Sequence, residues 1–416
     1  MLKLLIVNIL DREEKIMAEW VKCTIGDLCD TISDTYKGND ENVILVNTSD
    51  VLEGKILNHT LVPNKNLKGQ FKKTFRKNDI LFSEIRPANK RFAFINFEDT
   101  SNYIASTKLM VLRHNENILP EYLFAILKSN YILEELQHLA ETRSGTFPQI
   151  TFTSELSPMK VNLPDKKTQK QIVSILSSIE HKMDANENIN NNLLQQTRVI
   201  FKHWFTDNPN LDTMKQVPLA DLCLVVTKGT TPTTLGKPFV SKGINFIKAE
   251  SILNNHAIDK EKFAFIDSET NDLLKRSIIS SGDIVFTIAG TLGRFALIDD
   301  SVLPANTNQA VAIIRANQSK VTPEYLYSFF LGNWHNDYYT KRIQQAVQAN
   351  LSLGTIKSLP IPILSDKAML EYLGIIKPII AMTKANELEI TRLRAIRDAL
   401  LPQLMSGTLD VSDLDL

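Results

Sequence analysis

The sequence predicts an α+β protein in which one unit occurs twice, as a pseudo-twofold internal repeat. Three observations support this prediction. Short motifs recur at an offset near 200 residues, as Ala185-Asn186-Glu187 does at Ala385-Asn386-Glu387. Each copy has a region of short strand-like runs, and a long apolar stripe at helical spacing follows that region. Because a solenoid repeats every 20 to 50 residues, so long a period indicates duplicated domains.

The mixed region of each copy is predicted from short apolar runs that lie between turn residues. In the first copy the expected strands are residues 43–46, 79–85, 92–97 and 109–112, followed by a helix at 120–127. In the second copy they are residues 244–249, 282–289, 294–298 and 311–314, followed by a helix at 323–331. Both helices begin at a proline, Pro120 and Pro323, which suits the first helical turn.

The helical region of each copy is predicted from apolar residues at three- and four-residue steps. In the first copy, from about residue 168 to 205, they are Ile172, Ile175, Leu176, Ile179, Met183, Leu193, Ile200 and Trp204. In the second copy they are Leu373, Ile376, Ile379, Ile390, Leu393, Ile396, Leu400 and Leu404. Such steps are typical of a coiled-coil seam, with an ordinary core helix as the alternative. The equal repeat positions favour two helices packed against each other.

Three details of the helical regions are also expected. Pro378 should separate a short lead-in helix from the long one, and Pro402 should end it. The Asn-rich run at residues 186–192 is interpreted as a solvated face, with contact to a partner as the alternative.

The composition indicates a globular protein without a strong overall charge. The 416 residues are enough for two cores, and the formal net charge is zero, which argues against a wholly basic nucleic-acid binder. Residues 65–91 nevertheless hold nine Lys or Arg against two acids, so this strip either follows phosphates or is a solvated surface. The three cysteines form no disulfide framework, which fits a reducing cytoplasm.

The first residues are expected to stand outside the repeat. Residues 2–10 are apolar but too short to span a membrane, and no cleavage site of a secretory signal follows. We therefore expect residues 1–16 to be an N-terminal extension ahead of Met17, and no membrane segment elsewhere.

The sequence carries no convincing catalytic or metal-binding motif. The segment Gly229 to Lys237 lacks phosphate-loop spacing, and Asp207-Asn208-Pro209-Asn210 only loosely resembles the motif of amino-methyltransferases. The seven histidines are dispersed. These features favour a non-catalytic binding protein, and a self-contained nuclease or methyltransferase is the alternative from another class.

Motifs near the end of each mixed region carry a resemblance to a known family. In the first copy, Arg143-Ser144-Gly145-Thr146-Phe147-Pro148-Gln149-Ile150 leads to Val161-Asn162-Leu163-Pro164 and then to Gln169-Lys170-Gln171-Ile172. In the second copy, Gly290-Thr291-Leu292-Gly293-Arg294 is followed by Gln348-Ala349-Asn350-Leu351-Ser352-Leu353-Gly354 and Ser358-Leu359-Pro360-Ile361-Pro362-Ile363. Together with residues 20–28, these motifs resemble the specificity subunit of type I DNA restriction–modification enzymes over essentially residues 17–410.

The resemblance implies two target recognition domains separated by two long antiparallel coiled-coil helices. The domains would be residues 17–165 and 211–365, and the helices residues 166–210 and 366–416. The second helix departs from the pattern, because Asp366-Lys367-Ala368-Met369 lacks the pair Gln169 and Gln171.

The resemblance also implies a function and partners. Each domain would bind one half of a bipartite double-stranded DNA target and direct adenine-N6 methylation and cleavage by other subunits. Those partners would be methyltransferase (modification) subunits, two in number, and restriction/translocase subunits. No cofactor is expected in this chain; S-adenosylmethionine, ATP and Mg are expected on the partners. The alternative is a specificity subunit that serves a methyltransferase alone or a differently organised nuclease.

Candidate DNA contacts follow from residue chemistry, since Arg favours guanine and Asn or Gln favours adenine. The first cluster follows a strand in each copy: Arg86, Asn89, Lys90 and Arg91, with Thr291 and Arg294. The second precedes the long helix: Ser144, Thr146 and Gln149, with Gln345, Gln348 and Asn350. The third precedes a strand: Asn306, Asn308 and Gln309. All of these types are also ordinary turn residues.

Overall fold

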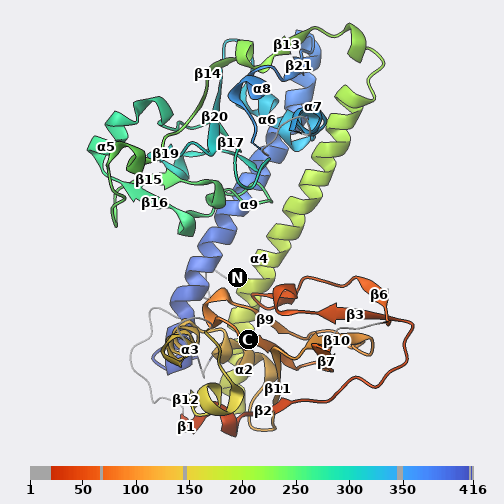
Figure 1. The fold of residues 1–416 in the computed structure, drawn as a ribbon, viewed down its shortest axis with the longest axis vertical. Coiled ribbons are helices and arrows are strands. Elements are labelled where there is room, and N and C mark those ends of the chain that lie inside the picture. The colour runs from red at the N-terminus through yellow and green to blue at the C-terminus, as the bar shows by residue number, and fades with distance from the viewer. Residues whose placement is uncertain (1–19, 66–68, 144–147, 344–349, 412–413, 415–416) are drawn as a thin grey trace. The chain divides into compact units, whose positions relative to one another are not determined.

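The computed structural model describes residues 20–65, 69–143, 148–343, 350–411 and 414 (Figure 1). The chain divides into two compact units, of which unit 1 takes in residues up to 183 together with those from 392 on. Unit 2 is residues 184–391. The predicted extension at residues 1–16 lies outside the described part of the chain. Each unit is described separately.

The mixed region of unit 1 holds two four-stranded sheets, with the orders β2-β11-β8-β9 and β6-β3-β10-β7. The first comprises β2 (Cys29–Ile32), β11 (Leu109–His114), β8 (Ile80–Ser83) and β9 (Phe92–Phe94). The second comprises β6 (Leu61–Pro63), β3 (Asn42–Val46), β10 (Tyr103–Ser106) and β7 (Phe71–Lys73). Smaller pairs are β1 (Val21–Thr24) with β12 (Lys160–Leu163) and β4 (Val51–Leu52) with β5 (Lys55–Ile56). The helices are α2 (Pro120–Leu127) and α3 (Asn130–Arg143).

Unit 2 repeats this topology. The sheet β14-β20-β17-β18 matches the first sheet of unit 1, and β16-β15-β19 matches the second. These strands are β14 (Cys223–Lys228), β20 (Val311–Ala316), β17 (Ile284–Thr287), β18 (Phe295–Leu297), β16 (Ala264–Ile266), β15 (Ile244–Ile247) and β19 (Ala305–Thr307). The remaining elements are the strand pair β13 (Gln216–Pro218) and β21 (Pro360–Pro362), with helices α5 (Ser268–Leu273), α6 (Pro323–Leu331), α7 (Trp334–Ile343) and α8 (Leu353–Lys357). In both units one strand pair is parallel, β10 with β3 and β19 with β15.

One buried ion pair recurs in both units and ties the start of a central strand to its neighbour. Arg113 in β11 donates to both carboxylate oxygens of Asp79, at 2.8 and 2.7 Å. Arg315 in β20 donates to Asp283 in the same bidentate way, at 2.7 Å twice. Because both aspartates are buried, these pairs belong to the scaffold that the two copies share.

The two long helices are α4 (Lys166–Phe201), of 36 residues, and α9 (Asp366–Ser406), of 41 residues. A π-helical turn at Lys202–Thr206 extends α4, so the helix expected at about residues 168–205 is confirmed. The prediction that Pro378 and Pro402 interrupt the second helix is wrong, because α9 runs through both. Each proline removes one hydrogen bond to the carbonyl four residues earlier. Pro378, Pro402 and the partner positions Gly374 and Asp398 are all exposed, so water can bind the carbonyls that are left free.

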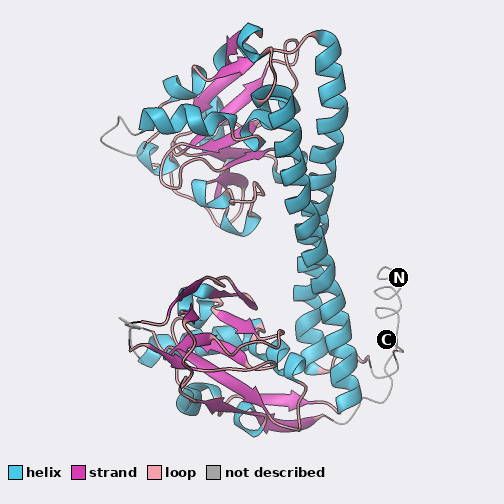
Figure 2. Ribbon diagram, turned by 90° about the vertical axis from the view of Figure 1, so that its right-hand side faces the viewer, coloured by secondary structure: helices cyan, strands magenta, loops and turns pink. Residues whose placement is uncertain are grey.

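Within unit 2, α4 and α9 lie side by side and antiparallel (Figure 2). The Nδ2 atom of Asn186 donates to Glu389 at 2.8 Å, and that of Asn190, further along α4, donates to the carbonyl of Thr383 at 3.3 Å. A higher residue number in α4 thus meets a lower one in α9. Asn186 is 1% exposed, so the interpretation of the Asn-rich run as a solvated face is wrong at this residue. There the side chain contacts the other long helix of the same chain, and contact of the run with a partner protein stays a prediction.

The helices also anchor the mixed region of unit 2. Phe201 and Phe205 at the end of α4 pack against Phe329 of α6, with ring centroids 5.1 and 4.7 Å apart. Tyr372 of α9 meets Phe205 at 5.2 Å. All four rings are buried, and each contributes on the order of 1.5–3 kcal/mol through burial. The α+β fold with two similar domains and two long helices is therefore confirmed.

Candidate nucleic-acid interface

The first predicted cluster in unit 1 forms a tight turn that follows β8. Arg86 and Lys90 adopt positive φ of 46° and 52° on either side of the 3₁₀ turn Pro87–Asn89. Positive φ is uncommon for residues other than glycine, so this turn is held by its surroundings. One such contact is the backbone N–H of Arg86, which donates to the carbonyl of Pro148 at 3.2 Å. The side chains of Arg86 and Asn89 are exposed.

Two predicted arginines instead bind the protein's own backbone. Arg91 donates through Nη1 to the carbonyls of Ser49 and Val51, at 3.0 and 3.3 Å. In unit 2, Arg294 donates through Nη1 to the carbonyl of Ile252 at 3.2 Å. The two arginines occupy matched positions and hold matched segments. Both arginines therefore have a structural role in holding these segments, and we leave both out of the interface proposed below.

The second predicted cluster is described only in part. Ser144, Thr146, Gln345 and Gln348 lie outside the described residues. Next to them, the N–H of Ile150 donates to the carbonyl of Glu84 at 2.9 Å, and that of Leu351 donates to Ile288 at 3.0 Å. These bonds place Gln149 and Asn350 beside the ends of β8 and β17. The structure thus brings together the first and second clusters, which are about 60 residues apart in the sequence.

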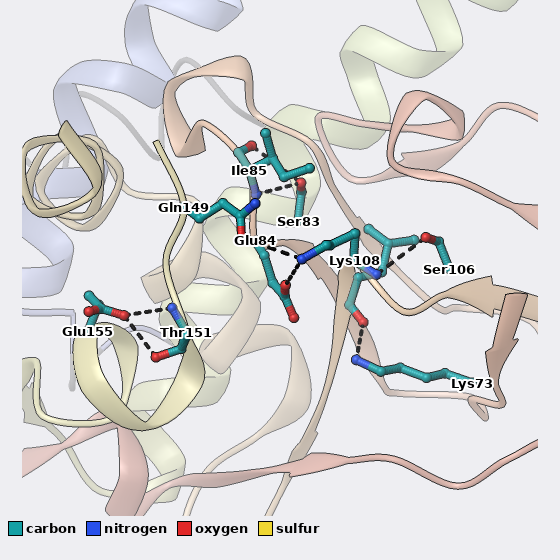
Figure 3. Close-up of polar contacts among 10 residues, drawn as sticks. Lys73, Ser83, Glu84, Ile85, Ser106, Lys108, Gln149, Thr151 and Glu155 are labelled. Carbon is teal, nitrogen blue, oxygen red and sulfur yellow. Dashed lines mark hydrogen bonds and ion pairs between the residues drawn. The ribbon is translucent and has the colours of Figure 1, made fainter. Parts of the chain in front are cut away.

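A polar group missing from the sequence predictions surrounds Gln149 (Figure 3). The ammonium of Lys108 lies 3.4 Å from Oε1 of Gln149 and 3.5 Å from Oε2 of Glu84. Nearby, the ammonium of Lys73 donates to the carbonyl of Leu109 at 2.8 Å. Burial lowers the pKa of Lys73, Glu84 opposes that shift, and Lys108 adds to it. In the sequence, Lys108 is visible as a lysine directly before the strand β11. Its neighbours Glu84 and Gln149 come from two other segments, so the sequence alone could not place the three side chains together.

The third predicted cluster divides into a buried and an exposed part. Asn306 is fully buried, and its Nδ2 donates to Asn271 and to the carbonyl of Leu274 at 2.9 and 3.2 Å. A buried amide with these partners cannot reach a base edge in this conformation, so we leave Asn306 out of the interface. Asn308 is half-buried and Gln309 is exposed.

The loop that begins at Gly229 lies against this third cluster. A Cβ atom at Gly229 would stand 1.8 Å from the carbonyl oxygen of Thr307, so only glycine permits this approach. Two residues later, the hydroxyl of Thr231 donates to Oε1 of Gln309. Arg276 lies 3.4 Å from the hydroxyl of Thr230. The loop rejected as a phosphate loop thus adds the hydroxyls of Thr230 and Thr231 next to the third cluster, and Arg276, from the turn Lys275–Ser277, brings a guanidinium to the loop.

Several cations of the basic strip at residues 65–91 are already bound within unit 1. Lys77 pairs with Glu98 at 2.5 Å, and Lys90 lies 3.8 Å from Glu53. A shallow pocket beside Lys90 is lined by Ala88, Asn130, Leu133, Glu134, Gln137, His138 and Glu141. Its two carboxylates disfavour phosphate on that side of the turn. Exposed basic residues of the strip include Lys72, Arg76 and Arg86.

The described residues do not gather three or more His, Cys, Asp or Glu side chains that could hold a metal ion. Burial raises the pKa of the Cys29 and Cys223 thiols to about 12, so neither is a thiolate nucleophile near neutral pH. In the part of the chain that the structure covers, every helix is too short or too polar to cross a membrane.

Comparison with known proteins relates both copies to one family. A family model for the type I restriction modification DNA specificity domain matches residues 17–195 and 212–392. The specificity subunit of the type I restriction enzyme HindI from Haemophilus influenzae is 31% identical, over 94% of this chain and 100% of the relative. The MjaIX specificity subunit from Methanocaldococcus jannaschii is 23% identical over 75% of each chain.

A solved structure supports the fold alone. The crystal structure of a type I restriction–modification system S subunit from M. genitalium aligns with a TM-score of 0.53 and 14% identity. The alignment covers 95% of this chain and 98% of that one. Since the family model matches both mixed regions and their helices, and the HindI relative matches from end to end, the chain belongs to the family of type I restriction–modification DNA specificity subunits.

Proposed function

We propose that the mixed region of each unit reads one half of a bipartite DNA target, with residues 17–165 and 211–365 as the two recognition domains. One observation carries this proposal: the two units share a scaffold but differ at its polar surface. Sheet order and the Asp–Arg ion pair are the same, whereas the turn after β8 carries Arg86 and Asn89 and its counterpart carries Thr291. Two domains with the same fold and different polar side chains at the surface are suited to bind two different half-sites, because base contacts set the sequence that is recognised.

The residues that we assign to DNA contact are those whose side chains the scaffold leaves at the surface. In unit 1 they are Arg86, Asn89 and Gln149, and in unit 2 Thr291, Asn308, Gln309 and Asn350. Lys90 remains a weaker candidate because it lies beside Glu53 and the carboxylates of α3. Arg and amide side chains recognise the edges of guanine and adenine in the major groove.

The chain would direct chemistry that other subunits perform. Specificity subunits are generally non-catalytic, and membership in this family implies DNA and partner subunits. We place adenine-N6 methylation and DNA cleavage, with S-adenosylmethionine, ATP and Mg, on two modification subunits and on restriction subunits in the cytoplasm. Exposed apolar side chains on α9, among them Leu370 at 73% and Met382 at 53%, support seating of modification subunits on the helices.

A domain exchange tests this function. Residues 17–165 are replaced by the same region of a relative, and methylated adenines are mapped in cells that also express the modification subunit. One half of the methylated sequence should change while the other half is retained. If both halves change in a folded and assembled complex, the two domains are not independent readers. Plasmid restriction, measured with and without the restriction subunit, separates a full system from one that methylates alone.

A further inference from the structure

One surface position differs in chemistry between the units although the backbone around it is the same. In unit 1, Leu109 of β11 pairs with Ser83 of β8, and in unit 2, Val311 of β20 pairs with Thr287 of β17. Lys108, directly before β11 in unit 1, therefore corresponds to Ala310, directly before β20 in unit 2. The incoming segment also binds in the same way, through the N–H of Ile150 in one unit and of Leu351 in the other.

The matched positions carry charged side chains in unit 1 only. In unit 1 Glu84, Lys108 and Gln149, which are labelled in Figure 3, form one group, with Lys108 in contact with both other side chains. Their counterparts are Ile288, which is 4% exposed, Ala310 and Asn350. Side chains that a shared scaffold needs recur in both units, as the Asp–Arg pairs do. A charged group present in one unit only is not part of that shared scaffold, so it is available to distinguish what the two units bind.

The ammonium of Lys108 is accessible and incompletely bound. The side chain of Lys108 is 48% exposed and that of Glu84 22%. The contacts of 3.5 and 3.4 Å to Glu84 and Gln149 are longer than the 2.7–2.9 Å typical of charge-assisted hydrogen bonds. An ammonium has three donors, so it can be oriented by these two neighbours and still donate to a ligand.

The neighbours of Lys108 favour a base edge over a phosphate group as that ligand. A carboxylate next to the ammonium repels phosphate, which carries negative charge on all its free oxygens. The same carboxylate does not exclude a base pair, because base edges present donors beside acceptors. The turn that carries Arg86 begins two residues after Glu84, so the group lies next to residues already assigned to DNA contact.

We propose that Lys108, positioned by Glu84 and Gln149, reads a guanine in the half-site bound by unit 1, donating to the O6 and N7 acceptors in the major groove. This inference rests on the proposed function, since it presumes that unit 1 reads a half-site. Ala310 gives unit 2 no such donor, so the second half-site carries no guanine requirement from this position.

The experiment uses the full chain with its modification subunit and maps methylated adenines in cells. The wild-type map first establishes a bipartite sequence, and the domain exchange described above identifies the half read by unit 1. Lys108→Ala and Lys108→Met then test this inference alone. The Met variant keeps the length of the side chain without its charge. Lys77→Ala is the matched control, because Lys77 is similarly exposed at 44%, lies in the same unit, and pairs with Glu98 away from the group.

Both Lys108 variants should accept other bases at one guanine position of that half-site, with the other half and the gap unchanged. Binding to the original duplex should weaken by about ten- to a hundredfold, while substituted duplexes bind nearly as before. Lys77→Ala should leave the map unchanged. An unaltered map, or uniform weakening on all duplexes with a smaller salt dependence, overturns the inference, the latter because it marks a phosphate contact. Melting temperatures close to that of wild type are expected, because the side chain of Lys108 is half exposed and its ion pair with Glu84 is long and weak.

Discussion

The side-chain amide of Asn186 in α4 donates a 2.8 Å hydrogen bond to the carboxylate of Glu389 in α9, within unit 2. Its repeat counterpart, Asn386, donates to Asn190 at 2.7 Å. The repeated Ala-Asn-Glu motif, the clearest sign of duplication in the sequence, thus supplies cross-helix contacts from both helices. Polar contacts within an apolar seam select one register and orientation of the helices, at some expense of stability.

Replacing Asn186 should weaken this helix pair. Asn186→Ala removes a buried hydrogen bond, so the free energy of unfolding should fall by about 1–2 kcal/mol. Asn188→Ala is the control, because Asn188 is exposed on the same helix and should change stability by less than about 0.5 kcal/mol. Urea unfolding followed by circular dichroism measures both. Equal losses in the two variants would show that the Asn186 contact carries no specific stabilisation.

The buried ion pair of unit 2 should be far more sensitive than a surface pair. Asp283→Ala leaves the guanidinium of Arg315 without its bidentate acceptor, and breaking such a pair should reduce stability by about 3 kcal/mol. Lys237→Ala breaks the exposed pair with Glu269 and should reduce it by less than about 1 kcal/mol. Thermal and urea unfolding compare the variants. A small effect of Asp283→Ala would mean that water replaces the carboxylate at Arg315.

Unit 2 should lose stability as the pH falls below neutrality. Burial lowers the pKa of His256 and of His335 to about 4, and nearby Arg198 adds to the shift of His256. A histidine whose folded pKa lies below its unfolded value near 6.5 stabilises the fold above 6.5, and this stability is lost as the pH falls from 6.5 toward 4. At pH 5.5 the loss is about 1.4 kcal/mol per histidine. Glu387, whose pKa burial raises, partly offsets this loss.

Melting temperatures of the full chain between pH 7.5 and 5.5 test this dependence. His256→Asn suits the positive φ of 70° at this position and removes one titrating group. The variant should show a flatter dependence on pH than wild type, and His138→Gln, which changes an exposed histidine, should not. The same slope in all three proteins would mean that His256 is not kept neutral by burial.

Substitutions at Arg294 and Arg86 should distinguish a residue that stabilises the fold from a residue that contacts DNA. Arg294→Met removes the bond to the carbonyl of Ile252, so it should lower stability by about 1–2 kcal/mol and leave the methylated sequence unchanged. Arg86→Asn keeps a residue that tolerates positive φ, so it should leave stability unchanged and weaken binding to the target duplex. Unfolding and fluorescence anisotropy on duplex DNA measure the two effects. Altered recognition in a stable Arg294→Met variant would return that arginine to the interface.

Elements with a strong local signal were predictable from the sequence. The run Ile80-Leu81-Phe82 is buried throughout in a central strand, and Pro120 begins α2 where a proline fits the first turn. The helix α3 was missed, because its buried residues Ile132, Leu133, Leu136 and Ala140 lie among charged residues and make a weak stripe.

Whether a single polar residue is buried or faces outward depends on contacts with residues that are distant in the sequence. Asn306 looks like a turn residue, and only its contacts with Asn271 and Leu274 show that it is a buried amide. Lys108 looks like a solvated lysine until the fold brings Glu84 and Gln149 beside it. Local pattern therefore predicted where polar clusters occur, and tertiary contacts decided which of their members face outward.

The division of each long helix between the two units affects the order in which the chain can fold during synthesis. Unit 2 is continuous in sequence, from residue 184 to 391, so the ribosome adds all of its residues before it reaches position 392. Unit 1 needs residues 392 onward, where Leu393, Leu400 and Leu404 are buried. The mixed region of unit 1 is thus synthesised first, yet its unit is the last to complete its core. A nascent chain stopped near residue 391 would leave Ile172, Ile175 and Ile179 of α4 without the part of α9 that belongs to their unit, a target for chaperones and proteases.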